Sequence, residues 1–127
     1  MAGNLSDYLE DALLDHFLAT SAYTAPSAVY VALYTAAPSD SGGGTEVTGG
    51  SYARQSAAFD AASGGATANT SNIDFTGMPA CTVVAVGVFD AASSGNLLVH
   101  GTLSANKTVD AGDILRIASG DLDISID

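Results

Sequence analysis

Two histidines, His16 and His100, and one cysteine, Cys81, are the side chains best able to do chemistry in this sequence. Imidazole and thiolate groups act as general bases, nucleophiles or zinc ligands when a carboxylate or another ligand lies beside them. Neither histidine has such a neighbour at a metal-ligand spacing, and Cys81 begins an apolar run, which is typical of a buried structural thiol. The sequence therefore predicts no catalytic residue and no metal site.

Paired carboxylates are the next candidates, because two of them can share acid and base roles or bind calcium. Asp110 with Asp113, and Asp121 with Asp123, have no apolar neighbours that would raise a pKa, and no stretch has the order of an EF-hand loop. The glycines at 42–44 lack the lysine that follows a phosphate-binding loop. We expect a solvated acidic surface, no cofactor and no enzymatic activity.

The net charge of -11, from fourteen acidic and three basic residues, limits the partners. Nucleic acids and anionic membranes are disfavoured, because both are bound chiefly through Lys and Arg. No apolar run approaches the roughly 18 residues that span a bilayer, and no secretory signal opens the chain. A single cysteine cannot form an internal disulfide. These features predict a soluble protein that is made and kept in a cytoplasm.

One helix is predicted, over residues 4–20, with Asn4 or Ser6 as its N-cap. Apolar or aromatic side chains recur at three- and four-residue spacing and form one stripe, whereas acidic residues lie away from it. The stripe contains Leu5, Tyr8, Leu9, Ala12, Leu13, His16 and Phe17. A stripe of this kind must be covered, either by the domain's own sheet or by a subunit or partner. We therefore name Leu5, Tyr8, Leu9, Leu13 and Phe17 as candidate interface residues.

Residues 29–34 are predicted to form a strand with two apolar faces. Val29, Val31 and Leu33 share one face, and Tyr30 and Tyr34 lie on the other. Tyrosine combines an apolar ring with a polar tip, which suits an interface. Tyr30 and Tyr34 therefore complete the set of candidate interface residues.

The rest of the chain predicts short strands separated by turns. Residues 36–50 form a Gly-rich loop that is expected to be mobile unless something clamps it, and 61–71 form a second connection of small residues. Strands are expected at 52–59, 72–75 and 81–89 and in the C-terminal region, with a hairpin at Phe89–Leu97 and turns at Asn106–Lys107 and 110–113. Leu122, Ile124 and Ile126 are expected to share one strand face, and Asp121, Asp123, Ser125 and Asp127 the other.

This pattern gives seven or eight strands after one helix, with connections too short for crossover helices. We predict a mainly β protein: an antiparallel β-sandwich or jelly-roll-like barrel with one N-terminal amphipathic helix. Residues 1–127 are predicted to form a single domain, with the helix at 4–20 and the sandwich at 27–127.

Several segments together resemble a family of small virion proteins of tailed bacteriophages, labelled tail fibre or head decoration (cement) proteins. They are Asn-Leu-Ser-Asp-Tyr-Leu-Glu-Asp at the start, residues 29–40, Gly-Thr-Glu-Val-Thr-Gly-Gly-Ser-Tyr-Ala-Arg-Gln at 44–55, the hairpin at 86–101 and Leu-Asp-Ile-Ser-Ile-Asp at 122–127. The resemblance covers nearly the whole chain, least clearly at 61–79. It supplies no catalytic residues.

The resemblance implies a structural protein on the virion surface, assembled in the bacterial host cytoplasm. Our first expectation is a capsid decoration protein that binds the major capsid protein and stabilises the shell, as a homo-oligomer and most simply a trimer. The alternative is a tail fibre or adhesin component that contacts tail proteins or a host-surface glycan through an aromatic face formed by Tyr30, Tyr34 and Tyr52. The sequence leaves the choice between capsid and tail open.

Overall fold

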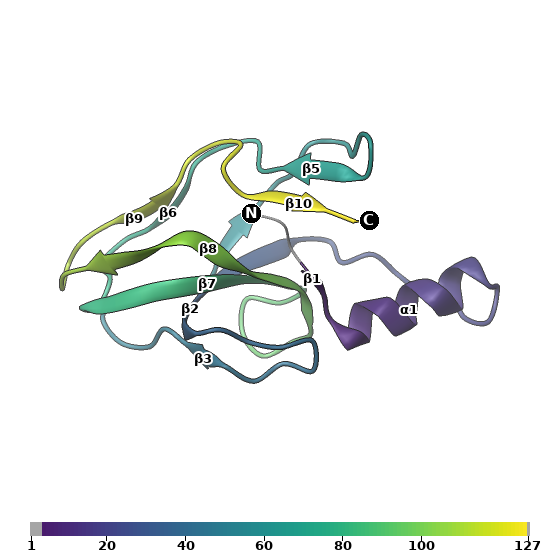
Figure 1. The fold of residues 1–127 in the computed structure, drawn as a ribbon, viewed down its shortest axis with the longest axis horizontal. Coiled ribbons are helices and arrows are strands. Elements are labelled where there is room, and N and C mark those ends of the chain that lie inside the picture. Colours follow the sequence, from purple (N-terminus) through teal and green to yellow (C-terminus); the bar gives the residue numbers. More distant parts are fainter. Residues whose placement is uncertain (1–3, 127) are drawn as a thin grey trace.

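A computed structural model describes residues 4–126 as a mainly β structure with antiparallel sheets and one helix, as predicted (Figure 1). The elements are, in chain order, β1 (Asn4–Leu5), α1 (Asp7–Phe17), β2 (Val29–Ala36), β3 (Thr45–Glu46), β4 (Gln55–Ala57), β5 (Ala66–Ala68), β6 (Ile73–Phe75), β7 (Cys81–Phe89), β8 (Leu97–Val109), β9 (Leu115–Ile117) and β10 (Asp123–Ser125). Nine described strands thus follow the helix, more than the seven or eight predicted, because very short strands complete the sheet edges.

The largest sheet has the strand order β1-β8-β7-β2-β3, and β4 also pairs with β2. All of its pairings are antiparallel. β7 is the central strand and carries the run of β-branched and small residues that the sequence shows at Cys81–Phe89. β2 is paired by β4 at one end and by β3 at the other, so its outer edge is shared between two short strands.

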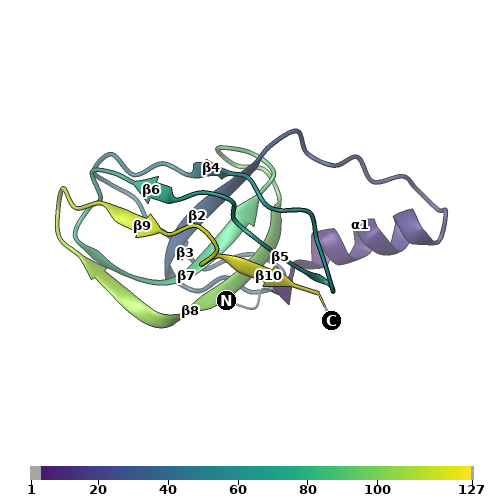
Figure 2. The same ribbon diagram turned by 90° about the horizontal axis from the view of Figure 1, so that it is seen from above.

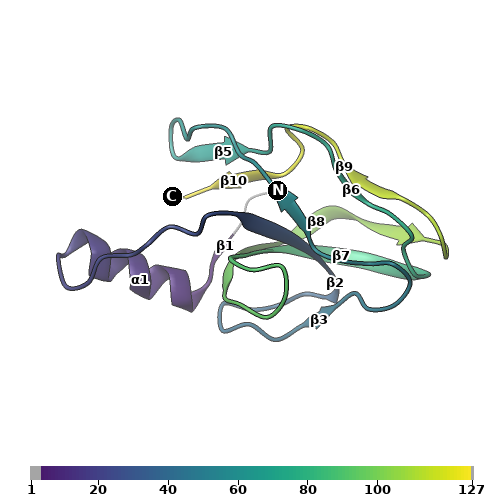
Figure 3. The same cartoon turned by 180° about the vertical axis from the view of Figure 1, so that it is seen from behind.

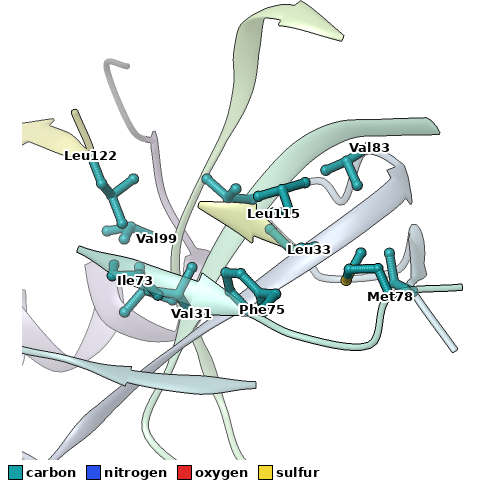
Figure 4. Close-up of a cluster of buried hydrophobic side chains, with 12 residues drawn as sticks. Val31, Leu33, Ile73, Phe75, Met78, Val83, Val99, Leu115 and Leu122 are labelled. Atoms are coloured by element: carbon teal, nitrogen blue, oxygen red, sulfur yellow. The ribbon is translucent and has the colours of Figure 1, made fainter. Parts of the chain in front are cut away.

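Two small sheets, β6–β9 and β5–β10, lie over one face of the large sheet (Figure 2). The main core fills the space between these layers. It contains Val31, Leu33, Ile73, Phe75, Met78, Val83, Val99, Leu115 and Leu122, nine labelled members of the cluster in Figure 4. A smaller cluster of Ala32, Tyr34, Ala85, Phe89 and Leu97 lies on the other face of the sheet. The two clusters follow from the alternation of side chains along β2 and along residues 85–89 of β7, and the alternation is interrupted at the register shift between Val83 and Ala85.

Helix α1 is shorter than the predicted 4–20. Residues 4–5 pair with β8 instead, and Ser6 caps the helix by accepting a hydrogen bond from the Leu9 amide at 3.2 Å. The helix ends at Phe17, and Ala19 follows with a positive φ of 62°. No residue of α1 is buried, and the helix extends beyond the end of the sheet (Figures 1 and 3).

Strand β8 runs through the turn predicted at Asn106–Lys107. Its register against β7 explains the difference: Val83 pairs with Lys107 and Ala85 pairs with Thr102, so β8 takes five steps while β7 takes two. The extra residues form a bulge, and the chain continues in the same direction. The polar residues that suggested a turn therefore lie in an irregular stretch of strand.

Other predicted segments differ in extent. The strand expected at 52–59 is reduced to β4, and the connections expected at 36–50 and 61–71 contain β3 and β5. At the C-terminus, Leu122 is buried and Ile124 is half-buried, but Ile126 is exposed because it lies just beyond β10. Asp127, placed by the sequence on the polar face, lies outside the described residues.

Candidate functional site

An open depression of about 630 Å³ lies on the sheet face that carries Tyr34 and Phe89. Three parts of the chain surround it: the start of α1, the segment at 40–46, and the hairpin between β7 and β8. Its volume is within the range of sites that bind small molecules. The depression is therefore the candidate binding site.

Arg54 joins two of these walls. Its Nε and Nη2 atoms donate to the two carboxylate oxygens of Glu46 at 3.0 and 2.9 Å, and Nη1 donates to the carbonyl oxygens of Ala91 and Ser94 at 3.1 and 2.8 Å. Its Cζ atom lies 3.6 Å from the centroid of the Phe89 ring. Only 9% of the side chain is exposed. A planar guanidinium suits this combination of a bidentate ion pair and ring stacking, which a lysine could not reproduce.

Glu46 and Tyr52 continue the network towards the sheet. The Tyr52 hydroxyl donates to Glu46 Oε2 at 2.8 Å and accepts from the Leu33 amide at 2.9 Å. Leu33 lies between the part of β2 that pairs with β4 and the part that pairs with β3. Burial alone raises the pKa of Glu46, but the hydrogen bonds from Arg54 and Tyr52 outweigh it and lower that pKa. Burial is the largest cause that raises the pKa of Tyr52 well above its ordinary value. Glu46 is therefore ionised and Tyr52 protonated at neutral pH.

The hairpin wall is held by Asp90 and Asn96, as the sequence predicted for Phe89–Leu97. Asp90 accepts hydrogen bonds from the Asn96 amide at 2.7 Å and from its side-chain nitrogen at 3.0 Å. Gly95 has φ of 75°, and a Cβ atom there would lie 2.6 Å from Asp90 Oδ1. The loop thus needs glycine at this position, both for its backbone conformation and for space.

Tyr34 forms part of the floor. It is only 4% exposed, and its ring lies above Gly87, where a Cβ atom would be 3.0 Å from Tyr34 Cε1 and 2.9 Å from Leu97 Cδ1. Burial and the nearby Glu46 carboxylate raise the pKa of Tyr34, so its hydroxyl remains a hydrogen-bond donor at neutral pH. The absence of a side chain at Gly87 is what lets the ring approach β7 this closely.

The third wall begins where the chain passes from β1 of the sheet into α1. Ser6 is buried and donates its hydroxyl to the Leu97 carbonyl, while the Asp7 amide donates to the Asp40 carbonyl at 2.9 Å. The Asp40 carboxylate lies 2.8 Å from His100 Nε2. These contacts fix the first turn of α1 against β8 and the 40–46 segment. They also hold one end of the Gly-rich loop, which the sequence predicted to be mobile unless something fixed it.

The seven residues predicted to form an interface do not form one surface. Leu5 and Leu9 pack against the main core, and Tyr34 is buried beneath the depression. Leu13 and Tyr30 are half-buried. Tyr8 and Phe17 are 43% and 68% exposed, and Leu14 and Leu18 add 54% and 73% exposed side chains at the far end of α1. The apolar end of α1 is defined here as Leu14, Phe17 and Leu18.

The reactive side chains lie apart from one another. His16 accepts a hydrogen bond from the Tyr23 amide at 3.1 Å, far from the Asp40–His100 pair, and burial raises the pKa of the half-buried Cys81 thiol. Asp113 accepts from the Asp110 amide at 2.8 Å, so this acidic pair closes a turn. Among residues 4–126, no group of three or more His, Cys, Asp and Glu side chains is placed to hold a metal ion.

Sequence reasoning missed the chemistry of Arg54 and Glu46, although both lie in the 44–55 segment that carries part of the family resemblance. Arg54 is one of only three basic residues in the chain, which was the available signal. A cation so scarce in an acidic protein is expected to have a specific partner, but its partners in the hairpin lie about forty residues away and cannot be identified from spacing alone.

A family model described as podophage GP4 fiber I protein gp80 matches residues 4–125. The chain belongs to this phage fibre family. No curated protein matches the chain. The match agrees with the resemblance to small virion proteins of tailed phages, and it fits the tail fibre alternative better than capsid decoration, which was our first expectation. No helix in the described part of the chain is long and apolar enough to cross a membrane.

Proposed function

We propose that this protein is a non-enzymatic structural component of a phage tail fibre. The observation that carries the proposal is the match to a fibre family over residues 4–125, nearly the whole chain. Because the family is described as a fibre family, we propose that this protein lies on the tail. Capsid decoration, the expectation drawn first from the sequence, is the rival location on the particle.

The chemistry of the depression supports a role in binding over one in catalysis. Arg54 and Glu46 are engaged with each other and with the hairpin, so neither is free to transfer a proton. A nucleophile requires an adjacent base, and Cys81 lies at the far end of β7 from the depression-lining Phe89. We therefore propose no enzymatic reaction.

The apolar end of α1 supports a contact with other fibre subunits. Leu14, Phe17 and the C-cap residue Leu18 are each more than half exposed at the end of a helix that extends away from the sheet (Figure 3). Apolar side chains gathered on a projecting element are a recurring feature of protein interfaces. We propose that copies of the chain associate through this end of α1, and we keep the trimer expected from the sequence as the proposed assembly.

Cryo-electron microscopy of intact phage particles tests the location. A Fab fragment raised against this protein should add density at the tail, and particles of a strain that lacks the gene provide the control. Fab density repeated over the icosahedral shell would instead establish capsid decoration. Absence of Fab density from particles that are shown by mass spectrometry to lack the protein would overturn both locations.

A further inference from the structure

The depression contains a hydrogen-bonding group that the protein itself does not use. Among the described residues, the Tyr34 hydroxyl forms no hydrogen bond. No fully buried side-chain oxygen or nitrogen in this part of the chain lacks a partner, so the hydroxyl must remain accessible. Tyr34 is 96% buried and lines the depression. The small exposed part of this residue therefore faces the depression. An almost buried donor left open towards a cavity is a group that a ligand can satisfy.

The other polar groups around the depression are mainly acceptors. Asp7 and Asp40 line it and carry negative charge, and Glu46 balances Arg54. Arg54 already makes four hydrogen bonds within the protein. An anionic ligand would meet these carboxylates without a free cation to oppose them, so phosphorylated or acidic ligands are disfavoured.

The rim supplies an aromatic surface. Tyr8 lines the depression from the first turn of α1, and 43% of this residue is exposed. The face of a phenol ring can pack against an apolar patch of C–H groups while its edge stays in water. A ligand that combines an apolar face with several hydroxyl groups therefore matches this site better than a simple cation, which would use the carboxylates and leave the Tyr34 donor without an acceptor.

We propose that the depression binds a neutral saccharide, with Tyr34 donating to a sugar oxygen, Asp40 accepting from a sugar hydroxyl and the Tyr8 ring packing against the sugar face. Sugar hydroxyls both donate and accept, so one ligand can use both kinds of group. A volume of about 630 Å³ accommodates one or two sugar rings. The inference rests on the proposed fibre function, and the observations that carry it are the free Tyr34 hydroxyl, the carboxylates and the exposed Tyr8 ring.

Nuclear magnetic resonance titration of the ¹⁵N-labelled 127-residue protein tests the proposal. The probes are glucose, galactose, mannose, rhamnose and N-acetylglucosamine, with tri-lysine as a cationic probe. We expect at least one sugar to produce saturable shifts of the backbone amides at 41–44, which line the depression. Tyr34→Phe should raise the Kd of that sugar about tenfold, the loss expected for one hydrogen bond to a ligand.

Tyr30→Phe is the matched control, because Tyr30 lies on the same face of β2 but outside the depression, and it should leave the Kd unchanged. Asp40→Asn provides a second variant that should also weaken binding if Tyr34→Phe fails to fold. No sugar-dependent shift at these amides, equal binding by Tyr34→Phe, or shifts with tri-lysine alone would overturn the saccharide proposal. Fab density at the tail together with any of these results would leave the fibre function standing.

Discussion

Arg54 lies over the ring of Phe89, with 3.6 Å between its Cζ atom and the ring centroid, and at the same time holds Glu46 through two hydrogen bonds. One side chain thus joins the end of β7, the short strand β3 and the carbonyl groups of the β7–β8 hairpin. The shape of the depression depends on this residue.

Arg54→Lys should destabilise the protein although it keeps the charge. Lysine cannot form the bidentate pair with Glu46 and reach the Ala91 and Ser94 carbonyls at once, so we expect a loss of about 1–3 kcal/mol in the free energy of unfolding. Chemical denaturation monitored by circular dichroism measures this loss.

Arg116→Lys is the matched control. Arg116 also holds a carboxylate, Asp74, with two hydrogen bonds of 2.7 and 2.9 Å, but the side chains are 57% and 37% exposed. Its substitution should cost clearly less stability than Arg54→Lys, because solvent screens an exposed ion pair. Equal losses for the two variants would mean that burial of the Arg54 pair contributes nothing.

Glu46 should make stability depend on pH in the acid range. Its pKa is lowered in the folded protein, so its stabilising contribution is complete above the unfolded value of about 4.3 and is lost as the pH falls through the lower folded value. Glu46→Gln cannot titrate. We therefore expect the unfolding free energy of this variant to fall less steeply than that of the original protein below about pH 4.

Thermal unfolding at a series of pH values from neutral to acid measures the two slopes. The comparison with the unsubstituted protein removes the contribution of the other carboxylates that both share. Parallel curves would contradict the prediction, because they would place the acid sensitivity entirely in other groups such as Asp74, whose pKa the hydrogen bond from Arg116 lowers.

Asn69→Ala should be among the most damaging single substitutions of a polar residue. Asn69 is 2% exposed, donates to the carbonyl oxygens of Ser71 and Ala118 at 2.8 and 3.0 Å, and accepts from the Leu122 amide at 2.9 Å. Removing its amide leaves the Ser71 carbonyl and the Leu122 amide without these buried partners, whereas the Ala118 carbonyl still accepts from the Asp121 amide. We expect a loss of about 2–4 kcal/mol in the free energy of unfolding.

Asn72→Ala tests whether this loss reflects burial. Asn72 is exposed and accepts one hydrogen bond, from the Ser119 amide at 2.9 Å. Its substitution should cost less than about 1 kcal/mol. Urea denaturation of both variants gives the comparison, and a loss for Asn69→Ala no larger than for Asn72→Ala would show that the network is replaced by water.

The fold class followed from periodicity, and the functional details did not. Alternation along Cys81–Phe89 and turn chemistry at Asp90 and Asn96 depend on neighbours in sequence, so both were predictable. The roles of Asn69 and Arg54 depend on carbonyl groups 49 and about 40 residues away. The Asn-Thr-Ser triplet at Asn69 carries no local signal of such a contact, and only the three-dimensional arrangement reveals it.

The apolar end of α1 should control association. Phe17 is 68% exposed, so Phe17→Asp removes an apolar contact surface without opening a cavity, and the variant should unfold within about 0.5 kcal/mol of the original protein. Sedimentation equilibrium should show an oligomer, expected to be a trimer, for the original protein and a monomer for the variant.

Leu9→Asp is the control: Leu9 packs against the main core, so this change should destabilise the fold itself by about 2 kcal/mol or more. An oligomer that survives Phe17→Asp and Leu14→Asp together, or an original protein that is monomeric at high concentration, would exclude self-association through this end of the helix.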